Sequence, residues 1–212
     1  GIYLAERDFG QAKILIGHRG PERIPNDLHD IVVFNRIFGR GGFGALLFSE
    51  IRSKLGLAYS VYGGFAPDNP EGTFQIYMAT RVEQAIKAIN KSLEIIDRSQ
   101  NELPNASTFS NIKSQLSRSY VFKFVNPFSI ANREARLEML GYPSNWDDVY
   151  LDKVADVTKE DVVSVAERRI RKENLVIVIV GRISAEELKG KIDLDLPVYN
   201  FKFDEVPKIA NE

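Results

Sequence analysis

The order in which strand-like and helix-like patterns follow one another is the feature that most restricts the fold of this chain. Alternation with a period of two predicts strands in three stretches, at residues 11–18, 58–65 and 72–79. Apolar residues at helical spacing predict helices at 27–38, 44–54, 81–98, 107–124, 128–140 and 159–170. The apolar run LVIVIV at 175–180 is typical of a central strand buried on both faces.

The predicted order is therefore strand, two helices, hairpin, four helices, strand and a last helix after Ser184. Strands and helices do not alternate regularly, which argues against a doubly wound parallel sheet and predicts an α+β domain in two layers. We expect residues 1–190 to form a single domain and residues 191–212 a C-terminal tail that ends in disorder.

Several local signals mark where these elements begin and end. Side chains that can cap a helix N-terminus precede the helical patterns: Asp27, Thr158, and the capping-box pairs Thr80/Glu83 and Ser184/Glu187. Gly56 stands where a left-handed residue would end the second helix. In the hairpin, one predicted face carries Tyr59, Val61 and Phe65, and the partner strand carries Phe74, Ile76 and Met78.

Composition excludes several classes of function. The chain has no cysteine, which excludes disulfides, thiolate metal sites and cysteine catalysis. Its formal net charge of −1 gives no sign of a nucleic-acid partner. No stretch approaches 18 apolar residues, so we expect no membrane span. The start at Gly1 predicts a segment of a longer protein, whose location, periplasmic or cytoplasmic, the sequence leaves open.

The loop GRGGFG at residues 39–44 matches the G-x-G-x-x-G pattern of dinucleotide-binding proteins. Such a loop must follow a strand and be followed by an acid about 20 residues on. Here the preceding DLHDIVVFNRIF has helical spacing, and the first acid after the next strand is Asp68, in the hairpin loop. Nucleotide binding is therefore a weak alternative, and a connector between two helices is favoured.

Residues 35–65, NRIFGRGGFGALLFSEIRSKLGLAYSVYGGF, resemble the signature of the second half of the pitrilysin-type zinc peptidases. That family includes insulin-degrading enzyme and the mitochondrial processing peptidases. The resemblance covers residues 4 to about 188, and the family's Ser-Arg-Leu run is replaced by Ala45-Leu46-Leu47 and one loop glycine by Arg40. The matching residues are Asn35, Ile37, Gly39, Gly41, Gly42, Leu47, Ile51, Arg52, Gly56, Leu57, Ala58, Tyr59, Ser60 and Val61.

The resemblance implies a fold and a place in a larger protein. It implies a two-layer α/β sandwich with a mixed, mostly antiparallel sheet covered by helices on one face. Family members have two similar halves that close over a peptide, and the first half binds zinc through H-x-x-E-H. This chain has only His18 and His29 and no such motif, so the resemblance implies the half that binds no metal. Its expected partners are a zinc-binding half, in the same chain or as a subunit, and a peptide or unfolded protein substrate.

The resemblance also assigns roles to residues. Arg52 and Tyr59 match a pair that the family's second half contributes to the active site, where they contact the substrate carbonyl near the scissile bond. A guanidinium and a phenol are suitable donors to the oxyanion that hydrolysis creates. Gly39, Gly41, Gly42 and Phe43 are expected either to receive peptide or to act as a connector, and Phe43 either faces substrate or packs as a staple.

Two functions of different kinds follow. In the first, the chain is inactive alone and completes the active site of a zinc metallopeptidase. In the second, it is a structural or assembly subunit of the same fold, since the family includes non-catalytic subunits. The presence of both Arg52 and Tyr59 favours the first.

Overall fold

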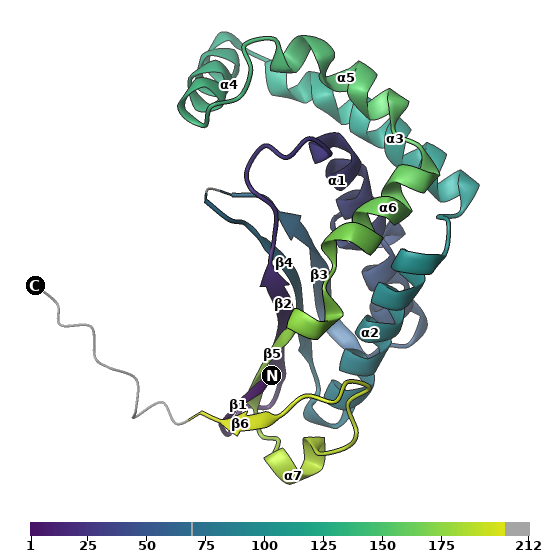
Figure 1. Ribbon diagram of the computed structural model, residues 1–212, viewed down its shortest axis with the longest axis vertical. Coiled ribbons are helices and arrows are strands. Elements are labelled where there is room, and N and C mark those ends of the chain that lie inside the picture. The colour runs from purple at the N-terminus through teal and green to yellow at the C-terminus, as the bar shows by residue number, and fades with distance from the viewer. Residues whose placement is uncertain (69, 202–212) are drawn as a thin grey trace, which may run out of the picture.

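The computed structural model describes residues 1–68 and 70–201, which build one twisted sheet with helices packed against it (Figure 1). Within these residues the sheet has six strands in the order β3-β4-β2-β5-β1-β6. Their bounds are β1 (Ile2–Glu6), β2 (Ala12–Arg19), β3 (Ala58–Ala66), β4 (Thr73–Thr80), β5 (Val176–Gly181) and β6 (Val198–Asn200). β2 pairs antiparallel with β4 and β5, and β3 antiparallel with β4, whereas β1 runs parallel to β5 and β6. The predicted mixed, mostly antiparallel sheet is confirmed.

The helices lie on one side of this sheet. They are α1 (Leu28–Asn35), α2 (Ala85–Asn101), α3 (Ala106–Tyr120), α4 (Pro127–Met139), α5 (Trp146–Asp156), α6 (Lys159–Arg169) and α7 (Ala185–Leu188). Figure 1 shows α2 and α6 along the sheet, and α3, α5 and α4 as an arm that arches past α1 at one end of the molecule. The two-layer α+β architecture predicted from the order of elements is confirmed.

The core lies between the helices and the sheet face that they cover. Val61 and Phe65 of β3 and Phe74, Ile76 and Met78 of β4 are buried there, as the alternation predicts. β5 lies between β2 and β1, so its central position is confirmed. The prediction that β5 is buried on both faces is wrong. Ile177 and Ile179 are buried, but Val176 points to the uncovered face of the sheet and is exposed.

Two of the predicted helix caps are wrong. Asp27 does precede α1, but its carboxylate makes no cap; it accepts hydrogen bonds from Arg169 Nε at 2.7 Å and from Arg168 at 3.3 Å. Thr80 belongs to β4, and its hydroxyl donates to the carbonyl of Leu57 instead of capping α2. The hairpin continues to Thr80, so α2 begins only at Ala85, after a 3₁₀ turn at Val82–Gln84 that contains Glu83.

Two other caps are confirmed. Thr158 forms a capping box with Asp161 at the start of α6, and Ser184 forms one with Glu187 at α7. Gly56 has φ +59° and ends the second helical segment as expected.

Three elements were not predicted: β1, α5 and β6. β6 is a short strand at one edge of the sheet, and β1 lies between it and β5. β6 belongs to the segment that was set apart as a tail. Ile192 in that segment is buried as well. The expected disorder of the chain end falls on residues 202–212, which lie outside the described residues. No helix among the described residues is long and apolar enough to cross a membrane.

Candidate functional site

The glycine loop lies between two stretches of π-helix. α1 runs directly into η1 (Arg36–Arg40), and η3 (Phe48–Lys54) follows the loop after a 3₁₀ turn at Gly42–Gly44. π-helical turns cost stability and occur frequently at functional sites. The loop therefore follows a helix, and the strand that a dinucleotide-binding loop requires in front of it is absent from the described structure here.

The glycines of this loop serve its tight packing. Gly39 is buried, and a Cβ there would lie 2.6 Å from the backbone nitrogen of Gly63 in β3. Gly42 has φ +65°, a conformation that other residues adopt only with strain. Gly41 is half-buried, and a Cβ there would lie 2.2 Å from the carbonyl oxygen of Arg36. Buried Gly39 thus acts in packing, and the exposed part of the loop consists of Arg40 and residues 42–44.

Asn35 fixes the start of the loop to the sheet. Its side-chain amide donates to the carbonyl of Phe65 at 2.8 Å, and its Oδ1 accepts from the Phe65 backbone N–H at 2.7 Å. Both groups are buried, so this pair of hydrogen bonds replaces a missing ladder partner for β3. The junction of α1 and η1 is therefore held rigidly against the strand that carries Tyr59.

Arg52 lies on η3, which ends in a turn that leads directly to β3. Gly56 N–H donates to the Arg52 carbonyl at 3.1 Å, and Leu57 N–H donates to the Ile51 carbonyl at 2.9 Å. Ile51 is fully buried while Arg52 is exposed, so the helix packs on one side and presents the guanidinium on the other.

Tyr59 occupies a β-bulge. Ala58 pairs with Thr80 and Ser60 with Ala79, so Tyr59 is the extra residue that has no partner in β4. It is 74% exposed, whereas Val61 and Phe65 are buried. The prediction that these three side chains share one face is thus wrong for Tyr59. A bulge commonly redirects a side chain next to an active site.

Arg52 and Tyr59 come together at the surface. Arg52 Cζ lies 5.5 Å from the centroid of the Tyr59 ring and 4.7 Å from that of Phe48. Phe48 in turn contacts Phe43 edge to face, with ring centroids 4.8 Å apart, and Phe43 is 84% exposed. We call these four residues the Arg52 surface. Within the described chain no carboxylate pairs with Arg52, so its donors are available to a ligand.

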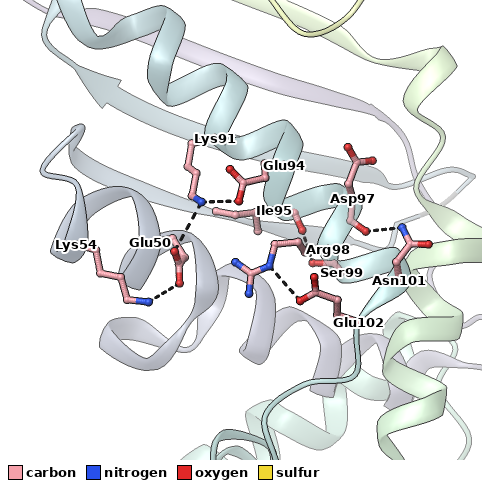
Figure 2. Close-up of polar contacts among 10 residues, drawn as sticks. All are labelled: Glu50, Lys54, Lys91, Glu94, Ile95, Asp97, Arg98, Ser99, Asn101 and Glu102. Atoms are coloured by element: carbon pink, nitrogen blue, oxygen red, sulfur yellow. Dashed lines mark hydrogen bonds and ion pairs between the residues drawn. The ribbon is translucent and has the colours of Figure 1, made fainter.

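Figure 2 shows how ion pairs attach η3 to α2. Glu50, two residues before Arg52, accepts a hydrogen bond from Lys54 at 2.7 Å and lies 3.8 Å from Lys91 Nζ of α2. Lys91 also pairs with Glu94 at 2.6 Å. The hydrogen bond from Lys54 lowers the pKa of Glu50. Because the Glu50 and Lys91 side chains are largely buried, this link restrains the position of the helix that carries Arg52.

Neither histidine is suited to hold zinc. His18 uses both ring nitrogens, one against the Arg19 carbonyl at 2.6 Å and the other accepting from Arg171 N–H at 3.1 Å. His29 stacks on Trp146. In residues 1–68 and 70–201 no three His, Cys, Asp or Glu side chains form a group that could hold a metal ion.

Residues 1–116, more than half of the chain, match the family model of the Peptidase M16 inactive domain. The chain belongs to this family. The pitrilysin-type resemblance is thereby confirmed. An uncharacterized zinc protease of Streptomyces coelicolor is 30% identical over 169 residues, which are 78% of this chain and 36% of that protein. The uncharacterized zinc protease YmxG of Bacillus subtilis is 25% identical over 83% of this chain and 42% of its own length. The chain spans well under half of these relatives.

Solved structures show the same fold. A peptidase M16 inactive domain from Pseudomonas fluorescens superposes with a TM-score of 0.80 at 25% identity, over 87% of this chain and 44% of the other. A chain of Complex III2 from Candida albicans has a TM-score of 0.67 at 16% identity, over 88% of this chain and 46% of that one. The fold of this chain is thus found both in another M16 inactive domain and in a chain of Complex III2.

Two features of the site were not visible in the sequence. Phe48 joins the loop to Arg52, and its position three residues before Ile51 was the only signal available. The bulge at Tyr59 had no signal at all, because AYSVYGGF reads as regular alternation. Glu50 was part of the EIRSKLGLAYSV match, yet its contact with α2 depends on the tertiary structure.

Proposed function

We propose that this domain is the half of a zinc metallopeptidase that binds no metal, and that Arg52 and Tyr59 contact the substrate at an active site shared with a zinc-binding half. The observation that carries the proposal is the meeting of these two exposed side chains, 5.5 Å from guanidinium carbon to ring centroid, although they come from different elements. Each lies on an irregular segment, a π-helix and a β-bulge, of the kind found near active sites.

The chemistry of the pair suits peptide hydrolysis. Zinc bound by the other half would supply the activated water of a metallopeptidase. Negative charge then develops on the carbonyl oxygen of the scissile bond, and the Arg52 guanidinium and the Tyr59 hydroxyl are donors that can stabilise it. Since Arg52 pairs with no carboxylate in the described structure, binding such an oxygen requires no ion pair to be broken.

The uncovered face of the sheet has the character of a binding surface, which supports the proposal that a partner lies on that side. Exposed apolar side chains line it, and Tyr62 of β3 contacts Tyr77 of β4 with ring centroids 5.2 Å apart. The others are Tyr3, Leu15, Val176 and Tyr199. Apolar patches of this kind on a protein surface commonly mark a binding site. We infer that this face meets a peptide or the zinc-binding half.

The test uses the complete protein that contains this chain. Two quantities are measured: the rate at which it hydrolyses a fluorogenic peptide and its zinc content. Arg52→Ala and Tyr59→Phe should each lower kcat/KM on the order of 10²–10³-fold. Zinc content should stay unchanged, because neither residue is a metal ligand. Arg81→Ala is the matched control, since Arg81 is exposed and lies outside both the Arg52 surface and the strands of the sheet. Normal turnover in Arg52→Ala and Tyr59→Phe would refute the assignment.

A structural or assembly subunit is the second candidate, favoured by the fold shared with a chain of Complex III2 from Candida albicans. At 16% identity that match concerns the fold alone. The two candidates differ in one measurement. If the complete protein binds no zinc and hydrolyses no peptide, yet removal of this domain dissolves an assembly, the subunit role replaces the peptidase role.

A further inference from the structure

A second candidate site lies between α1 and the far end of the helical arm. It is an open cavity of about 640 Å³, within the size range of ligand pockets. We call it the α4 pocket. Its charged lining is basic, from Lys123, Arg133 and Arg136, and its apolar lining includes Phe128, Trp146 and Tyr150.

The basic side chains are held in place by aromatic rings. Tyr120 and Tyr150 stack with centroids 4.2 Å apart, and Lys123 Nζ lies 4.4 Å and 5.1 Å from their centres. Burial against these rings, together with the nearby charge of Arg133, lowers the pKa of Lys123 to about 8. The ammonium is therefore still charged at neutral pH.

The carboxylate nearest to these cations, Asp147, is already engaged. It accepts hydrogen bonds from Arg133 Nε at 2.6 Å, from Arg133 Nη2 and from the Tyr120 hydroxyl. In the described part of the chain, Lys123 and Arg136 form no ion pair with a carboxylate. The α4 pocket thus carries uncompensated positive charge, which calls for an anionic ligand.

The apolar wall of the pocket is also uncovered. Phe122 is 71% and Phe128 is 78% exposed. α4 is amphipathic but fully buries none of its side chains, and its Leu137 is only partly buried against the core. Aromatic side chains beside unpaired basic groups match a ligand that carries both an apolar group and a carboxylate. A purely apolar partner would leave Lys123 and Arg136 without a counter-charge.

A separate groove, which shares Phe122 with this pocket, reaches the glycine loop. It is lined by Gly41 and Gly44 of the loop, by polar residues of α3 such as Asn111 and Gln115, and by Phe122, which also lines the α4 pocket. At its other end the loop carries Phe43, which reaches Arg52 through Phe48. One extended chain could therefore lie along the Arg52 surface, the loop and the groove, and end in the pocket.

We propose that the α4 pocket binds a segment of the peptide substrate in which an acidic side chain lies next to an aromatic or aliphatic side chain. The inference rests on the proposed function, since it assigns the ligand as substrate. It adds a preference for acidic segments at a distance from the scissile bond.

Trp146 offers a direct readout, because it is the single tryptophan of the chain and lines the pocket. The 212-residue chain is titrated with the acetylated, amidated tetrapeptide Ala-Phe-Glu-Ala and with its counterpart Ala-Phe-Gln-Ala, following Trp146 emission. The glutamate peptide should bind about fivefold more tightly. Lys123→Gln and Arg136→Gln should each weaken it about fivefold and leave the glutamine peptide unaffected. Lys87→Gln, on the exposed side of α2, is the matched control.

Equal affinity of the two peptides, or an unchanged affinity in Lys123→Gln and Arg136→Gln, would overturn the proposal. So would a dimer in sedimentation that Lys123→Gln dissociates, because a second copy would then be the occupant. This experiment needs neither zinc nor turnover. If Arg52 and Tyr59 prove essential while the two peptides bind alike, the pocket assignment alone falls. If the glutamate peptide binds selectively while Arg52→Ala and Tyr59→Phe turn over normally, the catalytic proposal alone falls.

Discussion

At the scale of single residues, His29 shows how a buried polar atom couples stability to pH. Its ring stacks on Trp146 at 4.9 Å and lies 5.7 Å from Tyr150, and its Nε2 is buried without a hydrogen-bond partner. Burial, and secondarily the charge of Lys153, lowers the pKa of His29. The folded protein therefore disfavours the protonated ring more than the unfolded chain does.

The free energy of unfolding should accordingly fall as pH drops below the ordinary histidine value of about 6.5, because the unfolded chain then binds the proton that the folded state resists. His29→Phe keeps the aromatic stacking and removes the titration. Urea unfolding at pH 7.5 and pH 5 should show a smaller loss for His29→Phe than for the parent sequence. His18 titrates in both proteins, so the difference isolates His29. An identical loss in both would show that His29 takes no part.

The residues of the Arg52 surface show what the sequence could and could not predict at this scale. Arg52 and Tyr59 were identified through the EIRSKLGLAYSV match, and their separation of seven residues did not by itself bring them together. What does so is Gly56 at φ +59° and the bulge at Tyr59. A bulge depends on the partner strand, since it is the pairing with Ala79 and Thr80 that leaves Tyr59 extra. The sequence of β3 alone therefore does not predict the bulge.

At the scale of elements, the attachment of η3 to α2 is the feature we expect to matter. Glu50→Gln keeps the shape of the side chain and removes its charge. It should lower the free energy of unfolding by about 0.5–1 kcal/mol, because the side chain is 15% exposed and faces both Lys54 and Lys91. Glu94→Gln is the matched control, since Glu94 pairs with the same Lys91 but is 53% exposed, and should change stability little.

The pH dependence of this pair has a definite sign. The pKa of Glu50 is lowered in the folded state, so its contribution is present above the ordinary value of about 4.5 and is lost as pH falls below it. Urea unfolding of Glu50→Gln and the parent should therefore differ at pH 7 and converge at pH 3. A difference that persists at pH 3 would point to packing instead of charge.

The helix boundaries show why the sequence predicts the existence of a helix better than the residue at which it begins. Thr158 and Ser184 cap α6 and α7 because their hydroxyls have no tertiary partner that competes. Thr80 fits the same pattern, but its hydroxyl bonds to the Leu57 carbonyl across the sheet. Asp27 likewise pairs with Arg169 of α6. Where tertiary contacts offer a buried side chain a charged or backbone partner, they override the local capping pattern.

At the scale of the whole molecule, the elements missed in the sequence are those held by distant partners. β1 and β6 are five and three residues long, and each is stable only beside a strand from the other end of the chain. α5 packs through Trp146, Tyr150 and Val154. Short segments carry too few periods for their pattern to be recognised, so the sequence predicted β2 to β5 and missed β1 and β6.

The distribution of buried residues predicts that stability is uneven across the molecule. α2 buries eight residues, whereas α4, at the end of the arm in Figure 1, fully buries none. Backbone amides of α4 should therefore exchange with solvent through local opening, at rates on the order of 10–100-fold faster than those of α2, which need a larger unfolding event. Hydrogen exchange followed by mass spectrometry of peptides from 127–139 and 85–101 measures both in one sample.

The same measurement connects stability to the α4 pocket. A ligand that binds the folded arm and not its locally opened form stabilises the folded arm by mass action. Saturating Ala-Phe-Glu-Ala should therefore slow exchange in α4 and leave α2 unchanged. Lys123→Gln should need about fivefold more peptide for the same protection. It should not alter the exchange of free α4, because the variant removes a charge that packs on rings instead of a helix contact. If α4 and α2 exchange together in the free protein, the arm opens only by global unfolding, and the uncovered face of α4 is as stable as the core.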